Sequence, residues 1–265
     1  MMNLSGVSIV LPTLNEKSNL QILIPGIIEQ LNKLNLTRYE IIIIDDNSSD
    51  GTEEFINILR KKNDNLIFFN RDGTKSLPLS ILKGIEMSKY EYVMWLDADG
   101  SMSPHSVGVL IERLNKSDNS VVIGSRFVEG GGYKGIKDVG NDSIFSAVKN
   151  VRSSKDSVAG MIFSKIFNSF LTKLNFGDIK DLTSGFVIGK KIYFSEKVFL
   201  NASYGEYFIY LCNDLLKNDV NVIEVGYICE TRIHGISKTA SNFLQLVKRG
   251  IPYIQAAYKS RKENT

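Results

Sequence analysis

The chain has 265 residues, of which 43% are hydrophobic and 23% are charged. This composition is ordinary for a globular protein and excludes bulk disorder, and the length suits one α/β domain with a small appendage. The formal net charge of +3 is too small to indicate a nucleic-acid partner. No apolar run reaches the roughly 18 residues that span a bilayer, and no secretory signal opens the chain, so we expect no membrane span.

Short β-branched runs alternate with segments of helical period over the first half of the chain. The pattern predicts strands at residues 7–11, 40–44, 66–70, 92–96 and 121–124, and helices at 19–34, 50–62 and 76–89. The strand runs lack polar alternation, as expected of strands buried on both faces. This order of elements indicates parallel β/α/β units joined by right-handed crossovers.

The rhythm breaks after residue 124. A polar, glycine-rich stretch up to residue 156 predicts a loop, followed by a helix at 158–174 with a wide apolar face. Strands are expected at 185–188 and 222–225, with a helix at 206–218 between them. The last segment, 242–261, predicts an amphipathic helix interrupted around Gly250, Ile251 and Pro252, ending in lysines and arginines. The two cysteines, Cys212 and Cys229, lack zinc-like spacing, and we expect free thiols.

Polar residues follow most of the predicted strands, where open parallel sheets bind ligands. They are Pro12, Asn15 and Glu16 after the first strand, Asp45, Asp46, Ser48 and Asp50 after the second, Asp97, Asp99 and Ser101 after the fourth, and Ser125 and Arg126 after the fifth. An Asp or Ser after the second strand can accept hydrogen bonds from a base or a ribose hydroxyl. Neither a P-loop nor a GxGxxG dinucleotide motif is present.

The segment Asp97-Ala98-Asp99 is the most specific indication of a metal site in the sequence. Two carboxylates one residue apart, directly after a buried strand, can reach one hard cation together. Mg²⁺ and Mn²⁺ prefer oxygen ligands and keep positions for substrate phosphate oxygens. Either metal is therefore the expected cofactor.

Six motifs in this order resemble those of the family 2 glycosyltransferases, in particular the dolichyl-phosphate mannose synthase-like branch. They are VSIVLPTLNE (7–16), IIIIDDNSSDGT (41–52), YVMWLDADGSMSP (92–104), GSRFVEGG (124–131), DLTSGF (181–186) and RIHGISK (232–238). The resemblance implies the GT-A fold, a Rossmann-like, mostly parallel sheet flanked by helices. It further implies a catalytic domain at 1–240 and an amphipathic helical tail at 241–265.

The resemblance also implies roles for individual residues. The nucleotide-sugar site comprises Pro12, Asn15, Glu16, Asp45, Asp46, Ser48, Asp97, Ala98, Asp99, Asp181 and Ser184, with Thr183 in the sugar-pocket motif, and the metal site comprises Asp97, Asp99 and, by position, Ser101. Arg126, Arg232, Ser237 and Lys238 match the acceptor-phosphate site, and Asp99, Arg126, Arg232 and Lys238 are the expected catalytic residues.

The implied reaction is inverting transfer of a sugar from a GDP- or UDP-linked donor to a polyprenyl or dolichyl phosphate. A phosphate monoester is mostly ionised at neutral pH, so it requires cations and no general base. The two amphipathic segments are compatible with a membrane surface, and we expect a cytoplasmic protein peripheral to a membrane. Two alternatives stay open: a glycan or protein hydroxyl acceptor, with Glu206 or Asp181 as the base, and a non-catalytic nucleotide-sugar-binding module.

Overall fold

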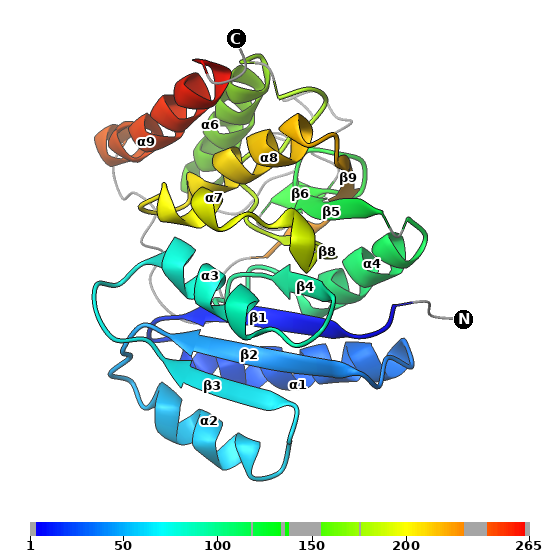
Figure 1. Cartoon of the computed structure of the whole chain (residues 1–265). Helices are drawn as coiled ribbons and strands as arrows, with labels where there is room; N and C mark the ends of the chain where they lie inside the picture. The colour runs from blue at the N-terminus through cyan, green and yellow to red at the C-terminus, as the bar shows by residue number, and fades with distance from the viewer. Residues whose placement is uncertain are drawn as a thin grey trace.

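A computed structural model of the chain describes residues 4–117, 119–133, 136–137, 155–174, 176–230 and 243–262. Its main element is a seven-stranded sheet with the order β3-β2-β1-β4-β8-β5-β9 (Figure 1). The strands are β1 (Val7–Thr13), β2 (Tyr39–Asp45), β3 (Leu66–Asn70), β4 (Tyr92–Trp95), β5 (Ser120–Ser125), β8 (Val187–Lys190) and β9 (Asn221–Gly226). All pairs are parallel except those of β8, which is antiparallel to both β4 and β5. The predicted mostly parallel α/β fold is confirmed.

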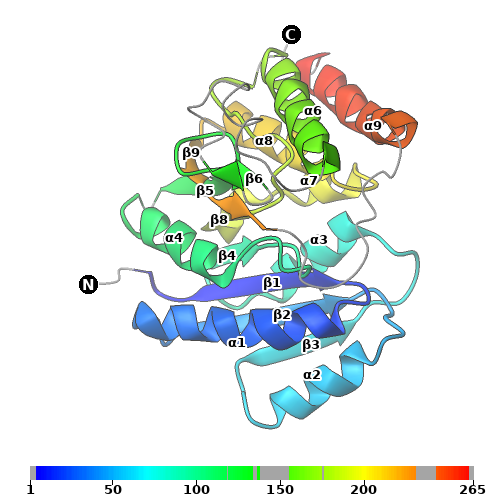
Figure 2. The ribbon, with the colours of Figure 1, turned by 180° about the vertical axis from the view of Figure 1, so that it is seen from behind.

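Alternate side chains of the central strands enter two separate cores, one on each face of the sheet. In β2, Ile41 and Ile43 face the core beneath α1 (Lys17–Lys33) and α4 (Pro104–Asn115), whereas Ile42 and Ile44 face the other core. Both faces are buried, which explains the unbroken apolar run in the sequence. Figure 2 shows the α1 and α4 side in front.

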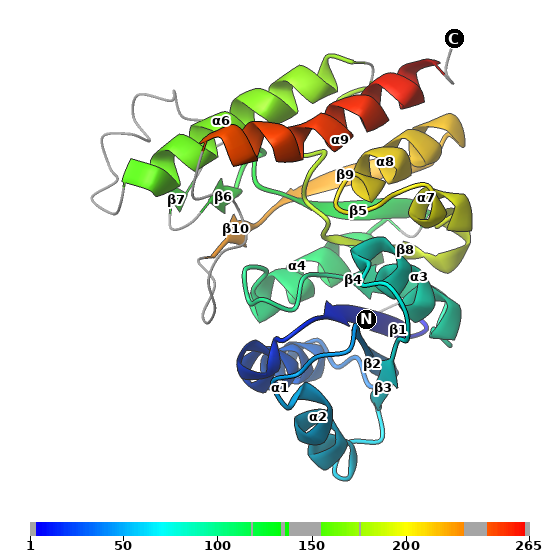
Figure 3. The ribbon, with the colours of Figure 1, turned by 90° about the vertical axis from the view of Figure 1, so that its left-hand side faces the viewer.

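The opposite core lies under a larger set of helices. These are α3 (Leu77–Met87), α6 (Lys155–Thr172), α7 (Glu196–Leu200), α8 (Tyr207–Lys217) and α9 (Phe243–Lys262), while α2 (Thr52–Arg60) lies beside β3. Figures 1 and 3 show α6 and α9 side by side as the outermost layer at the β5–β9 end of the molecule. Helix α9 packs on α8, and its Ala256 and Ala257 are fully buried. The division of the chain at residue 240 stays a prediction.

Two details differ from the sequence-based expectations. The expected interruption of the last helix is wrong, because α9 runs continuously through Gly250 and Pro252. Gly250 packs against the ring of Phe167 on α6, so tertiary contact outweighs the low helix propensity of this segment. The glycine-rich segment is also not purely a loop, because β6 (Gly132–Tyr133) pairs with β7 (Ile136–Lys137) and with β10 (Ile228–Cys229).

Candidate active site

The loops after β1 and β2 hold each other through their polar side chains. Asn15 adopts a left-handed backbone conformation, with φ of 58°, and its Oδ1 accepts a hydrogen bond from the Ser49 backbone N–H at 2.8 Å. The Asn15 N–H donates to Ser48 Oγ at 2.7 Å, and that hydroxyl donates to Asp45 Oδ1 at 2.6 Å. Three residues predicted for the nucleotide pocket, Asn15, Asp45 and Ser48, therefore form one cluster at the carboxyl ends of adjacent strands.

Asp46 holds the connection between β3 and α3. Its carboxylate accepts hydrogen bonds from Arg71 Nε at 2.7 Å, from Ser80 Oγ at 2.9 Å and from the Ser76 backbone N–H at 2.7 Å. Arg71 also donates to the Thr74 carbonyl oxygen at 2.6 Å. The Asp46 carboxylate thus fixes the first turn of α3 through Ser76 and Ser80, and it ties this turn to Arg71 after β3. The sequence signal for this contact is the position of Arg71 directly after β3.

The Asp97-Ala98-Asp99 segment follows β4 as a tight turn. Asp99 Oδ1 accepts a hydrogen bond from the Ser101 N–H at 2.9 Å, and Gly100 between them has φ of 78°. The Asp97 N–H donates to the sulfur of Met102 at 3.4 Å. Local side-chain-to-backbone bonds of this kind are the reason Asp favours turns. The bond from Ser101 sets the direction of the Asp99 carboxylate, and the bond to Met102 holds the backbone at Asp97.

A cavity of about 220 Å³ opens beside this turn. It brings together predicted residues from three strand ends with residues of α3 and of the segment before α8. Its lining comprises Pro12, Thr13, Leu14, Glu16, Asp46, Lys75, Ser76, Leu77, Ser80, Asp97, Ala98, Asp99, Ser203 and Tyr204. The sequence analysis missed the wall formed by Lys75, Ser76, Leu77 and Ser80. Asn15, Asp45, Ser48, Ser101, Arg126, Asp181 and Ser184 lie outside the lining.

Asp97 and Asp99 are suitable ligands for a divalent cation whose coordination shell is completed by substrate oxygens. Both carboxylates line the cavity, and both belong to the hard oxygen donors that Mg²⁺ and Mn²⁺ prefer. Across the part of the chain that the structure describes, no three His, Cys, Asp or Glu residues gather as a metal site. The two aspartates would therefore hold the ion together with phosphate and water oxygens, as is usual for magnesium bound with a nucleotide.

Arg126 and Asp181 form a buried ion pair. Arg126 Nε and Nη2 donate to Asp181 Oδ2 and Oδ1 at 2.8 and 2.7 Å, and Nη2 also donates to Thr183 Oγ1 at 2.7 Å. The Arg126 side chain is 11% exposed and that of Asp181 is fully buried. Burial acts to lower the pKa of Arg126, but the Asp181 charge outweighs it and raises the pKa well above its usual value. The guanidinium stays charged.

Asp181 is held from its backbone as well. The N–H groups of Lys180 and Asp181 donate to the Glu224 carboxylate of β9 at 2.8 and 3.0 Å. Ser184, in the same motif, accepts the Phe186 N–H at 3.3 Å. The DLTSGF motif is thus anchored to the sheet through β9 and Arg126. Arg232, Ser237 and Lys238, together with the rest of RIHGISK, lie outside the described residues.

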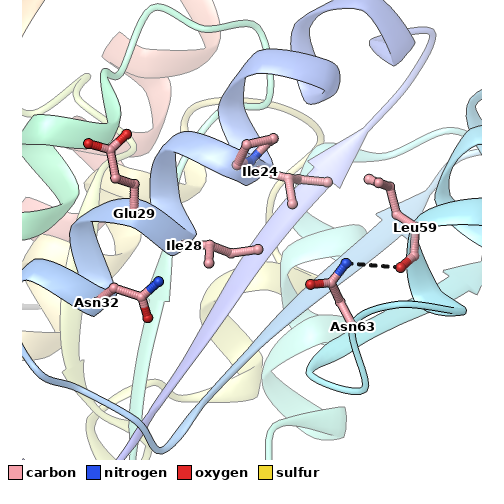
Figure 4. Close-up of a pocket in the computed structure, with 7 residues that line it drawn as sticks. Ile24, Ile28, Glu29, Asn32, Leu59 and Asn63 are labelled. Atoms are coloured by element: carbon pink, nitrogen blue, oxygen red, sulfur yellow. Dashed lines mark hydrogen bonds between the residues drawn. The ribbon is translucent and has the colours of Figure 1, made fainter.

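A larger hollow of about 330 Å³ lies between α1 and α2 (Figure 4). Its walls are Ile24, Pro25, Ile28, Glu29, Asn32, Leu59 and Asn63, and it includes none of the predicted site residues. Glu29 is the one charged residue in this lining, and it pairs with Lys33 on the surface of α1. The hollow lacks the convergent polar groups that characterise a ligand site. We therefore assign the chemistry to the smaller cavity at the strand ends.

The mostly parallel sheet, with paired carboxylates at its strand ends, is an α/β fold of the GT-A type. The profile of the family described as "Glycosyl transferase family 2" matches residues 8–196, and the chain belongs to this family.

The chain is similar to three characterised relatives over part of their length. It is 34% identical over 167 residues to the poly(ribitol-phosphate) beta-N-acetylglucosaminyltransferase TarP of Staphylococcus aureus, covering 57% of this chain and 49% of the relative. It is 32% and 30% identical to the dolichol-phosphate mannosyltransferases of Pyrococcus furiosus and Saccharomyces cerevisiae, over 161 and 125 residues, or 58% and 47% of this chain. These matches span 44% and 46% of the mannosyltransferases, so the chain spans less than half of each relative.

The fold is also that of glucosyl-3-phosphoglycerate synthase from Mycobacterium tuberculosis. The structure in complex with Mn²⁺, uridine diphosphate and phosphoglyceric acid superposes with a TM-score of 0.62 over 97% of this chain and 78% of the synthase chain. A second structure of that protein contains Mn²⁺, UDP-glucose and phosphoglyceric acid, with a TM-score of 0.60 and the same 97% coverage of this chain. At 16% and 15% identity, the likeness shows the fold alone.

Proposed function

We propose that the chain is an inverting glycosyltransferase that moves a sugar from a GDP- or UDP-linked donor to a polyprenyl phosphate. The observation that carries this proposal is one cavity, which Asp97 and Asp99 line together with Pro12, Glu16 and the first turn of α3. Carboxylates for a phosphate-bound metal and polar groups for a nucleotide meet there at the carboxyl ends of the strands, where α/β sheets bind such ligands. Family membership gives the same reaction class.

The residues of the cavity match the charge changes of sugar transfer. Negative charge develops on the leaving diphosphate as its bond to the anomeric carbon breaks. A bound Mg²⁺ or Mn²⁺ supplies electrostatic stabilisation of that charge, and Asp97 and Asp99 are the residues that would hold it. Lys75, which lines the same cavity, would add a positive charge near the same ligand. The Asp46 network orients the wall that carries Lys75.

Two carboxylates considered as bases are occupied by other partners, which favours a phosphate acceptor. Asp181 is fully buried and paired with Arg126. The Glu206 carboxylate accepts hydrogen bonds from Ser203 and Tyr204. A hydroxyl acceptor requires a carboxylate free to take its proton, whereas an ionised phosphate does not.

The two dolichol-phosphate mannosyltransferases support a polyprenyl phosphate acceptor, whereas TarP and the synthase show that other acceptors occur among similar proteins. Their names and bound molecules include dolichol phosphate, poly(ribitol-phosphate) and phosphoglyceric acid. We place Arg232, Ser237 and Lys238 of the RIHGISK motif at the acceptor phosphate, where cations would offset the repulsion between two phosphate groups.

The outer faces of α6 and α9 support a position at a membrane surface, on the cytoplasmic side that the sequence predicts. Ile166 and Phe170 on α6 and Ile251, Ile254 and Tyr258 on α9 are all at least 40% exposed. In sequence, the two helices hold seven Lys or Arg residues and one acidic residue, Asp156, whereas the whole chain is nearly balanced. Apolar side chains beside basic ones suit an anionic lipid interface. No helix among the described residues is long and apolar enough to cross a bilayer.

The test is transfer from radiolabelled GDP-mannose and UDP-glucose to a polyprenyl phosphate in detergent, with Mn²⁺ or Mg²⁺, beside an Asp99→Ala variant. We expect a lipid-linked product that requires the metal and Asp99. Transfer only to hydroxyl acceptors would contradict the proposal of a polyprenyl phosphate acceptor. Donor binding without any turnover would contradict the proposal that the protein is a glycosyltransferase. Co-sedimentation with vesicles of phosphatidylglycerol tests the membrane contact separately, with Ile251→Ser/Ile254→Ser expected to weaken it.

A further inference from the structure

The segment before α8 forms one wall of the cavity and exposes an aromatic ring there. Ser203 and Tyr204 line the cavity, and Tyr204 is 60% exposed. A ring at a cavity wall offers a flat apolar face and a phenolic hydroxyl to a ligand.

The turn that carries Tyr204 is held from within by Glu206. Glu206 Oε1 accepts hydrogen bonds from the Ser203 N–H at 2.7 Å and the Ser203 hydroxyl at 2.6 Å, and Oε2 accepts one from the Tyr204 N–H at 3.1 Å. Burial acts to raise the pKa of Glu206, but these hydrogen bonds outweigh it and lower the pKa. Glu206 is therefore a stable carboxylate that fixes the backbone of residues 203 and 204.

The same turn is fastened to the strand that leads into the metal-binding aspartates. Trp95, the last residue of β4, donates its indole N–H to the Tyr207 hydroxyl at 3.0 Å. Tyr207 is the first residue of α8 and stacks on Phe199. Since Asp97 follows Trp95 by two residues, the turn and the carboxylates share one rigid support.

Helix α9 supports the turn from behind. The hydroxyl of Tyr253 lies directly against Gly205, where an added Cβ would collide with it. Burial raises the pKa of Tyr253, and the charges of Tyr204, Glu206 and Asp97 raise it further. Asp97 also raises the pKa of Tyr207, after burial. The turn lies on the side of the DAD segment, because Ser203 and Tyr204 line the same cavity as Asp97 and Asp99 and the Trp95–Tyr207 hydrogen bond ties the turn to β4.

We propose that Tyr204 contacts the sugar of the donor and helps to select it, and that Glu206 and Tyr253 are positioning residues for Tyr204. This inference rests on the proposed function, because it takes the ligand to be a nucleotide sugar. The residues expected at the nucleoside come from the β1 and β2 loops, whereas Tyr204 belongs to a turn that is tied to β4, the strand before the aspartates. A ring beside the diphosphate end therefore meets the group beyond the diphosphate, which is the sugar.

The test compares equilibrium binding of nucleotide sugars and of the corresponding nucleoside diphosphates. UDP-glucose, GDP-mannose, UDP and GDP are titrated with Mn²⁺ into the wild type, Tyr204→Ala, Tyr204→Phe and Leu200→Ala. Leu200 is a matched control, since it is 58% exposed nearby on α7 and does not line the cavity. We expect Tyr204→Ala to raise the Kd of the bound nucleotide sugar about fivefold, as for loss of one aromatic contact, and to leave that of the nucleoside diphosphate nearly unchanged. Tyr204→Phe keeps most of the affinity.

Equal weakening of both ligand classes would place the ring on the nucleotide and overturn the inference. No change in the affinity for either class would overturn it as well. If Tyr204→Ala gives the expected binding contrast but the wild type forms no lipid product, the proposed acceptor is rejected and the role of Tyr204 at the sugar is retained. Glu206→Ala should reproduce the Tyr204→Ala contrast, and Glu206→Gln, which keeps one acceptor oxygen, should restore part of the affinity. A Glu206→Ala variant with wild-type binding would reject the positioning role.

Discussion

Arg126 donates hydrogen bonds to both oxygens of the fully buried Asp181 carboxylate, across 55 residues of sequence. The Arg126 backbone N–H adds a third bond to the same carboxylate at 2.9 Å. The pair joins the end of β5 to the DLTSGF motif, and Glu224 holds the motif from β9. Arg126 therefore has a structural partner, and any contact with phosphate would be shared with Asp181.

Removing Arg126 should destabilise the protein strongly. Arg126→Ala leaves the Asp181 charge buried without its partner, which costs about 3–5 kcal/mol in other buried pairs. Urea unfolding followed by circular dichroism measures the change. Lys33→Ala is the control, because it removes an exposed pair with Glu29 and should leave the free energy of unfolding nearly unchanged. A similar small cost for both variants would show that Asp181 finds another partner or a proton.

The sequence predicted the sheet and the strand-end residues because these depend on local patterns. Buried parallel strands give unbroken apolar runs, and their carboxyl ends converge, so Asp46, Asp97 and Asp99 were expected near one another. The cavity confirms that these three meet. The DAD segment needed no long-range information, since it follows β4 directly.

Pairings over long distances were not predictable from the pattern. Arg126 and Asp181 were both expected at the site, but nothing in either segment shows that they bind each other. The wall formed by Lys75 and Ser76 depends on how Asp46 holds α3, and the path of α9 through Pro252 depends on packing against α6 and α8. Such contacts arise only when the elements are assembled, which is why tertiary context overrides local propensity.

Neutralising either aspartate of the DAD turn should strongly slow metal-dependent transfer. Asp97→Asn and Asp99→Asn keep the size of the side chain but remove a negative charge from the expected metal site. We expect kcat to fall by about 10²–10³, the range for loss of one electrostatic contact to a transition state. Initial rates at increasing Mn²⁺ concentration measure the effect, with the exposed Asp64→Asn as control. Retained, metal-stimulated activity in both variants would contradict the assignment.

The contribution of Glu206 to the free energy of unfolding should decrease as the pH is lowered. The pKa of Glu206 is lowered in the folded protein, so its carboxylate contributes stability above the pKa of the unfolded chain, and this contribution is lost as the pH falls through the folded pKa. The free-energy difference between the wild type and Glu206→Gln should thus be largest at neutral pH and shrink in acid. Urea unfolding at a series of pH values tests this. A difference that grew toward acid would show that the pKa is raised instead.

The contact between Gly205 and Tyr253 predicts a mutation and its rescue. A Cβ at residue 205 would collide with the Tyr253 hydroxyl, and in the described structure its nearest other neighbour is the Tyr253 ring carbon Cζ, 3.0 Å away. Gly205→Ala should therefore push α9 away from the turn and lower stability by about 1–3 kcal/mol, the usual cost of overpacking. Tyr253→Phe removes the colliding oxygen, so the double variant should recover most of that loss. Thermal unfolding of the four proteins gives the coupling between the two sites. If the effects of the two single variants simply add, the hydroxyl does not contact Gly205 in solution, and Tyr253 would no longer account for the position of Tyr204.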